Sequence, residues 1–216
     1  MENDPTPKAD KTRHRHLAIT EPSPWVRRFA PLIAGQSVET QSILDLAAGG
    51  GRHTRHLLGL GHDVVATDRD TASLDDLKSD PNVEIIEADL ENGNPVFSGS
   101  GPLAGRTFKA IVVVNYLFRP LMDEIFSALD PGGVLIYETF ARGNEAFVRP
   151  RNPDHLLKSG ELLKLAEGRL QVVAYEHGIV EAADIEGVKQ RLCAINDLGE
   201  SERDDDEPAP HKVMPS

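Results

Sequence analysis

The chain has 216 residues, a length that suggests one ordinary globular domain. Its 23 Lys and Arg against 35 Asp and Glu give a formal net charge of −12, which argues against broad contact with nucleic-acid phosphates. The single cysteine, Cys193, excludes an internal disulfide and a cysteine-based zinc cluster. Apolar residues make up 39% of the chain, so a core can form without a covalent or metal staple.

Both ends of the chain have the composition of solvated segments. The first 20 residues are polar and contain no apolar run of signal-peptide length, whereas residues 197–216 are rich in Asp and Glu. We therefore expect a flexible segment over 1–20, a folded domain over 21–198 and a disordered acidic tail over 199–216. No apolar run is long enough to span a bilayer, so we expect a cytoplasmic protein without membrane contact.

Between these ends, strand and helix patterns alternate along the chain. In chain order we predict a helix at 25–33, a strand at 42–46, a helix at 52–60, a strand at 63–67, a helix at 71–79, strands at 83–87 and 110–114, a helix at 121–129, a strand at 133–139, a helix at 160–166 and strands at 170–178 and 188–196. Pro31 is expected to end or kink the first helix.

This alternation predicts an α/β fold: a doubly wound, Rossmann-like, seven-stranded and mostly parallel sheet with helices on both faces. The last two strands have no helix between them, so they should pair antiparallel at one edge of the sheet, which gives one antiparallel edge strand. In such sheets a ligand binds at the carboxyl ends of the strands, beside the first one.

A glycine-rich turn follows the first predicted strand. Asp45 stands near the end of this strand, and Gly49 and Gly51 precede the helix predicted from Arg52. Glycines there let a ligand approach the backbone and the free N–H groups of the helix. A dinucleotide site requires a third glycine, which is missing here. The acid at Asp45 would repel a pyrophosphate and suits a ligand with an amino group.

Residues 42–140, which include this turn, resemble the class I S-adenosylmethionine-dependent methyltransferases. Asp45, Ala47, Gly49 and Gly51 match the first motif of that family, with Ala47 in place of the usual first glycine. The resemblance implies further contacts with the cofactor: Asp68 with the ribose hydroxyls, and Asp89 and Leu90 with the adenine. The alternatives are that Asp68 only caps the next helix and that Asp89 only forms a turn. The Pro-Gly-Gly turn at 131–133 matches the turn that the family places before its fifth strand. The segment 156–162 also resembles small bacterial methyltransferases of the tellurite-resistance subgroup.

Two residues are predicted to lie at the methionine end of the cofactor. Arg52 stands in the first turn of a helix, where a cation opposes the helix dipole. This position suggests a ligand carboxylate nearby, although a solvated arginine is equally compatible with it. Asn115 follows the fourth strand, where the resemblance places a residue beside the methionine group.

The sequence gives fewer indications of the residues that bind the substrate. Tyr116 is either a pocket wall or a core residue. The long segment after the fifth strand is locally cationic, and Arg149 and Arg151 in it are candidates to meet an anionic group on the substrate. The alternative is a solvated surface loop. Glu138, Tyr116 and His155 are possible bases by position alone, so the catalytic residue stays open.

The predicted function is methyl transfer from S-adenosylmethionine to a small molecule. We expect no added domain that would recognise a protein or nucleic acid, which favours a small substrate. His53 and His56 are three residues apart, a spacing that metal ligands on a helix can have. No third ligand accompanies them, so no metal is expected. Two alternatives remain: a nicotinamide-dependent oxidoreductase and a non-catalytic nucleotide-binding module on the same fold.

Overall fold

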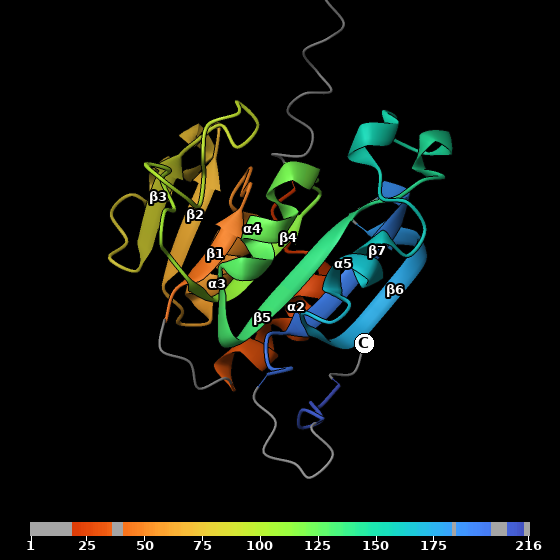
Figure 1. Cartoon of the computed structure of the whole chain (residues 1–216). Helices are drawn as coiled ribbons and strands as arrows, with labels where there is room; N and C mark the ends of the chain where they lie inside the picture. Colours follow the sequence, from red (N-terminus) through yellow and green to blue (C-terminus); the bar gives the residue numbers. More distant parts are fainter. Residues whose placement is uncertain (1–18, 36–40, 183–184, 200–206, 214–216) are drawn as a thin grey trace, which may run out of the picture.

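A seven-stranded sheet runs through the computed structural model of the chain (Figure 1), which describes residues 19–35, 41–182, 185–199 and 207–213. The strands follow the spatial order β3-β2-β1-β4-β5-β7-β6, so β3 and β6 are the two edges. Their bounds are β1 Ile43–Leu46, β2 Val64–Asp68, β3 Val83–Glu87, β4 Phe108–Val114, β5 Leu129–Phe140, β6 Gln171–Ala182 and β7 Ile185–Ile195.

The pairing confirms the predicted topology. β1 to β5 are parallel neighbours, whereas β7 runs antiparallel to both β5 and β6. The antiparallel strand lies one place in from the edge, between β5 and β6. Its register sets Lys189 opposite Phe140 and Arg191 opposite Glu138. β7 therefore begins at the edge where the parallel strands end, and it brings two cations to that edge.

The helices agree with the predictions in place but differ in length and type. α2 (Pro24–Ala34) continues past Pro31, α3 covers Arg52–Gly59, α4 is shortened to Met122–Ser127, and α5 covers Glu161–Ala166. The helix predicted over 71–79 is a 3-10 helix, η1 (Ala72–Leu77). Three further single turns of 3-10 helix are η2 (Arg119–Leu121), η3 (Asn144–Ala146) and η4 (Pro153–His155).

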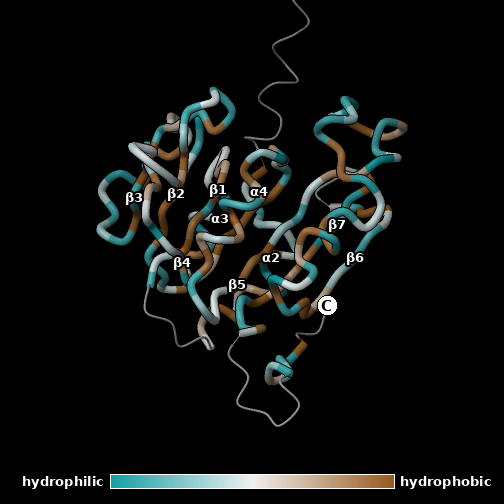
Figure 2. Tube along the Cα trace, viewed as in Figure 1, coloured by the Kyte–Doolittle hydropathy of each residue, from teal (hydrophilic) through white to brown (hydrophobic). Residues whose placement is uncertain are grey.

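Apolar side chains cover both faces of the sheet. α4 and α5 pack on one face, against Leu44, Ile111 and Leu135, while α2 packs on the other, against Ala110 and Ile136. Figure 2 shows this as brown central strands surrounded by teal loops. β4 is buried along its whole length, as a strand covered on both faces must be.

The described part of the tail contacts the domain. His211 Nε2 lies 2.6 Å from Asp197 Oδ2, directly after β7, and Pro208 is buried. In Figure 1 this segment lies at the bottom, at the opposite end of the strands from the loop after β5. Residues 1–18 and 200–206, on which much of the predicted flexible ends falls, are outside the described residues, and the limits of the domain stay a prediction. No helix in the described ranges is long and apolar enough to cross a membrane.

Candidate functional site

The turn after β1 is shaped by three residues in the left-handed region. Ala47, Gly49 and Gly51 have φ angles of 57°, 56° and 74°, and Gly51 is the N-cap of α3. The Ala48 N–H donates to Thr67 O (2.8 Å), which ties the turn to the end of β2. The glycine-rich motif thus forms a curled loop at the carboxyl edge of the sheet.

The two glycines are required for different reasons. A Cβ at Gly51 would stand 2.3 Å from Leu74 Cδ2 and 2.8 Å from Arg55 Nη1, so a side chain there would have to displace both of these side chains. A Cβ at Gly49 would meet nothing within 4 Å. Gly51 therefore serves the packing of the loop, and Gly49 leaves open space beside it that a ligand can enter.

Asp45 connects β1 to α3, the two elements on either side of this loop. The residue is 1% exposed, and its carboxylate accepts a hydrogen bond from Thr54 Oγ1 (2.6 Å) on α3. Burial raises the pKa of Asp45 to about 6, although the hydrogen bonds from Thr54 act in the opposite direction. The expectation that this acid faces an amino-bearing ligand does not fit the structure, because the carboxylate is enclosed between β1 and α3.

Asp68, at the end of β2, faces the loop. Its Oδ2 accepts the Gly49 N–H (2.8 Å) and its Oδ1 accepts the Asp70 N–H (3.1 Å). An ionised carboxylate has about four acceptor sites, so about two remain for a ligand. The neighbouring Asp70 caps the start of η1 by accepting the Ala72 N–H (3.1 Å), which leaves Asp68 free of that task.

The segment after β3 lies on the same side of the site. Asp89 is exposed and accepts the Glu91 N–H (3.0 Å), whereas Leu90 is buried in the core. Burial raises the pKa of Tyr116, and the negative charges of Glu91, Asp89 and Asp68 raise it further. Tyr116, expected at the substrate, therefore lies near the residues that were predicted to hold the cofactor.

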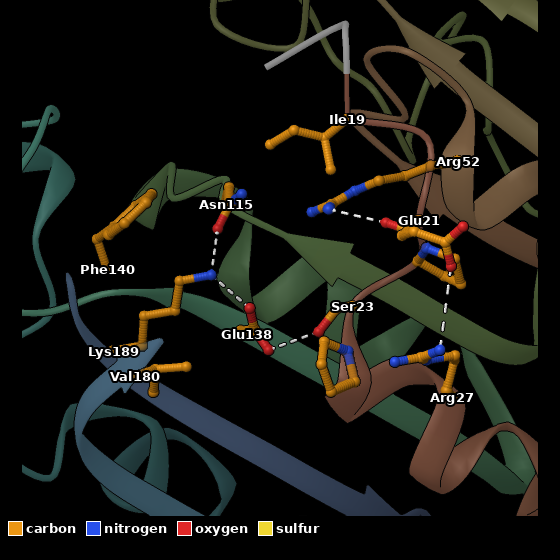
Figure 3. A pocket seen from close by; sticks show the side chains of 12 residues that line it. Ile19, Glu21, Ser23, Arg27, Arg52, Asn115, Glu138, Phe140, Val180 and Lys189 are labelled. Atoms are coloured by element: carbon orange, nitrogen blue, oxygen red, sulfur yellow. Dashed lines mark hydrogen bonds and ion pairs between the residues drawn. The ribbon is translucent and has the colours of Figure 1, made fainter. Parts of the chain in front are cut away.

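A pocket of about 230 Å³ opens on the other side of the loop (Figure 3). Arg52 and Asn115 stand at its border, and both were predicted from the sequence. The remaining walls come from the segment before α2, from the first turn of α2, and from β5, β6 and β7. The lining residues are Ile19, Glu21, Pro22, Ser23, Pro24, Arg27, Arg52, Asn115, Glu138, Phe140, Val180 and Lys189.

A buried charged network forms the floor of this pocket. Glu138 forms ion pairs with Lys189 Nζ and, at 3.0 Å, with Arg191 Nε, and it accepts a hydrogen bond from Ser23 Oγ (2.7 Å). Lys189 Nζ also donates to Asn115 Oδ1 (2.9 Å). Burial alone would raise the pKa of Glu138, but the two cations outweigh it and lower the pKa, so this carboxylate stays ionised.

His53 fixes the N-terminal segment against the network. Its Nε2 accepts the Ser23 N–H (3.2 Å), and the side chain is 4% exposed. Burial lowers the pKa of His53 to about 3, and Arg52 acts in the same direction. The ring is therefore neutral at pH 7 and acts as an acceptor. Arg52 holds the same segment, since its Nη1 donates to Glu21 O (3.1 Å).

The cationic loop after β5 is ordered but does not reach the pocket. Asn144, fully buried, donates to Val148 O and Pro150 O, and Arg119 binds Glu161 through two hydrogen bonds at 2.7 and 3.0 Å. Arg149 and Arg151 are exposed and neither lines the pocket, so this arrangement does not support their expected role at the substrate. His155 is likewise exposed and outside the lining.

Sequence reasoning missed most of the charged network. No role at the site was predicted for Ser23, Lys189 was placed only within a predicted strand, and Glu138 was considered only as a base by position. Their separations of 115 and 51 residues leave no local pattern. The one available signal is the pair of charges at Lys189 and Arg191, directly before the apolar run at 192–195 of the same predicted strand. Among the described residues, no three His, Cys, Asp or Glu side chains gather as a metal site.

Known structures with this fold include methyltransferases. TehB from Haemophilus influenzae, the tellurite-resistance methyltransferase, matches with a TM-score of 0.59 and 17% identity over 73% of this chain and 58% of TehB. The 1,6-didemethyltoxoflavin-N1-methyltransferase of Burkholderia thailandensis, solved with its substrate and S-adenosylhomocysteine, matches with a TM-score of 0.56 and 17% identity over 87% of this chain and 80% of that one.

A third solved structure with this fold is the [4+2]-cyclase SpnF, with a TM-score of 0.56 and 12% identity over 79% of this chain and 80% of that one. No family model and no curated protein matches the chain. The chain thus has the fold that these methyltransferases and the cyclase share, and the expected architecture is confirmed. Because one of the three is a cyclase, the reaction has to be argued from the site.

Proposed function

We propose that the chain binds S-adenosylmethionine along the carboxyl ends of β1, β2 and β4 and transfers its methyl group to a small molecule in the adjacent pocket. The observation that carries this proposal is the position of Asp68. Its carboxylate is held by the Gly49 N–H at the rim of the loop and keeps acceptor capacity for a ribose diol. The open space beside Gly49 gives a ligand access to that carboxylate.

The residues around the loop fit the remaining parts of this cofactor. Asp89 and Leu90 supply an exposed acid and an apolar side chain where an adenine would bind. Arg52 makes no ion pair within the described residues and is placed to bind the methionine carboxylate at the pocket border. Asn115, with a φ of 59°, is held by Lys189 beside the same border.

When bound, the cofactor would supply a methyl group activated by a sulfonium sulfur, so that an acceptor could take the methyl group in line with the thioether as leaving group. The task of this chain is to orient the two reactants and to exclude water. Glu138 is poorly suited as a base because its carboxylate is engaged by Ser23, Lys189 and Arg191 and its pKa is lowered. His155 is outside the pocket, so the site favours an acceptor that reacts without a dedicated base.

The nicotinamide alternative is disfavoured by two features. The dinucleotide motif would require glycine at position 54, where Thr54 is fully buried and bonded to Asp45. The sheet also carries the antiparallel β7 between β5 and β6, whereas the dinucleotide fold has parallel strands in the order 3-2-1-4-5-6. The non-catalytic alternative predicts no methyl transfer, so an assay of methyl transfer distinguishes it from the proposed enzyme.

Calorimetry with S-adenosylhomocysteine and NADH tests the cofactor. We expect S-adenosylhomocysteine to bind and NADH not to bind. Asp68→Ala should lose about 1.5–3 kcal/mol of binding free energy for S-adenosylhomocysteine, which is tenfold or more in affinity. Asp70→Ala is the matched control and should bind as the wild type does. Methyl-labelled S-adenosylmethionine, incubated with a metabolite extract, should pass its label to a small molecule. Unchanged affinity in Asp68→Ala would contradict the assignment of the ribose site.

A further inference from the structure

The pocket beside the proposed cofactor site holds a fixed ammonium group with spare donor capacity. Lys189 Nζ donates to Glu138 and to Asn115, and it lies 5.0 Å from the centre of the Phe140 ring. An ammonium group has three donors, so one remains. Figure 3 shows this nitrogen at the pocket wall, opposite Arg52 and Ile19. Its position is set by two partners before any ligand arrives.

Charges around the pocket are not balanced. Its lining carries Arg27, Arg52 and Lys189 against Glu21 and Glu138. Behind it, Glu176 is shared by two cations, Arg191 at 3.2 Å and Arg28 at 3.1 Å, so these residues add no negative excess. The site therefore has one positive charge in excess. An unmatched positive charge in a partly buried pocket is costly, and an anionic acceptor would offset it.

The remaining walls of the pocket are apolar and the space is small. Ile19, Pro22, Phe140 and Val180 contribute apolar side chains to the lining. The volume of about 230 Å³ is below the range typical of drug-sized ligands. This combination of a small apolar chamber and one fixed cation selects a compact ligand with one polar end.

We propose that the methyl acceptor is a compact, largely apolar molecule that bears a carboxylate, and that Lys189 binds this carboxylate. This inference rests on the proposed function, because it takes the pocket as the acceptor site. It assigns to β7 the recognition that the sequence suggested for Arg149 and Arg151. Glu138 and Asn115 then act as positioning residues, since they hold the ammonium group in place.

Binding of matched acids and amides to the protein saturated with S-adenosylhomocysteine tests the proposal. Benzoate, phenylacetate and hexanoate are compared with benzamide, phenylacetamide and hexanamide by calorimetry. We expect at least one acid to bind the wild type tenfold or more tightly than its amide. Equal binding of acid and amide, or binding of no acid in the panel, would overturn the proposal. This comparison needs no variant, so it stands even if Lys189 cannot be replaced.

The variant Lys189→Met sharpens the test. It should lower the affinity for the acid at least tenfold more than it lowers the affinity for S-adenosylhomocysteine, which loses only the support that Lys189 gives to Asn115. Lys164→Met removes an exposed lysine from α5 and should change neither. Retained binding of the acid in Lys189→Met would rule out Lys189 as the carboxylate partner. Failure of the wild type to bind S-adenosylhomocysteine is measured separately and would instead remove the proposed function.

Discussion

The two halves of the sheet edge are built in different ways. On the β1–β2–β3 side, the proposed cofactor site is made of backbone: a curled glycine loop, N–H groups donating to Asp68, and turns capped by Asp70 and Asp89. On the β5–β7 side, the pocket is made of side chains that join distant segments, such as Ser23 with Glu138 and Lys189 with Asn115.

This difference has an energetic consequence. Backbone turns are determined locally and tolerate changes in neighbouring side chains, whereas a buried charged network depends on every member. Removing one partner leaves the others buried without compensation. We therefore expect substitutions in the pocket half to affect folding most, and substitutions at the open side of the glycine loop to affect cofactor binding most.

The largest effect is expected for Glu138→Ala. It leaves Lys189 and Arg191 without their shared carboxylate, and it should lower the free energy of unfolding by about 3–5 kcal/mol. Urea unfolding followed by circular dichroism measures this. The control is Glu84→Ala, which removes an exposed pair with Arg106 (2.8 Å) and should cost less than about 1 kcal/mol. Equal losses of unfolding free energy in the two variants would contradict the larger contribution expected of the buried network.

The two glycines of the loop should separate stability from binding. In Gly51→Ala, the left-handed φ and the contact with Leu74 together should cost about 2–4 kcal/mol of stability. Gly49→Ala meets no neighbour and should cost only about 1–2 kcal/mol from its φ. Gly49→Ala should nevertheless weaken binding of S-adenosylhomocysteine, because its methyl group enters the open space. Wild-type affinity in that variant would place the cofactor elsewhere.

Acidification should weaken the link between α3 and the pocket half. A histidine whose pKa falls on folding binds its proton less well in the folded state, so its contribution to stability is lost as pH drops below 6.5 toward 3. Relative to His53→Gln, which keeps an acceptor for the Ser23 N–H, the wild type should lose about 2 kcal/mol between pH 7 and pH 5. Unfolding curves at both pH values measure this, and a constant difference would contradict the buried neutral ring.

The smallest effect is expected outside both halves. Deleting residues 207–216 removes the contact of His211 with Asp197, a partly exposed pair worth less than about 1 kcal/mol. Melting temperature should fall by a few degrees at most, and affinity for S-adenosylhomocysteine should not change, because the contact lies at the opposite end of the strands. A loss of affinity would show that the tail communicates with the site.

The sequence alone determined the sheet, the glycine loop and the place of Asp68, because alternating apolar runs, glycines and strand-end acids are local patterns. It misjudged the lengths of α4 and η1, where tertiary packing overrides helix propensity. Only the tertiary structure decided that Lys189 reaches the pocket. That outcome depends on the antiparallel entry of β7 and on its register against β5, which sets Phe140 opposite Lys189 and Glu138 opposite Arg191. Strand register is a long-range property, so no local pattern around Lys189 could have revealed its partners.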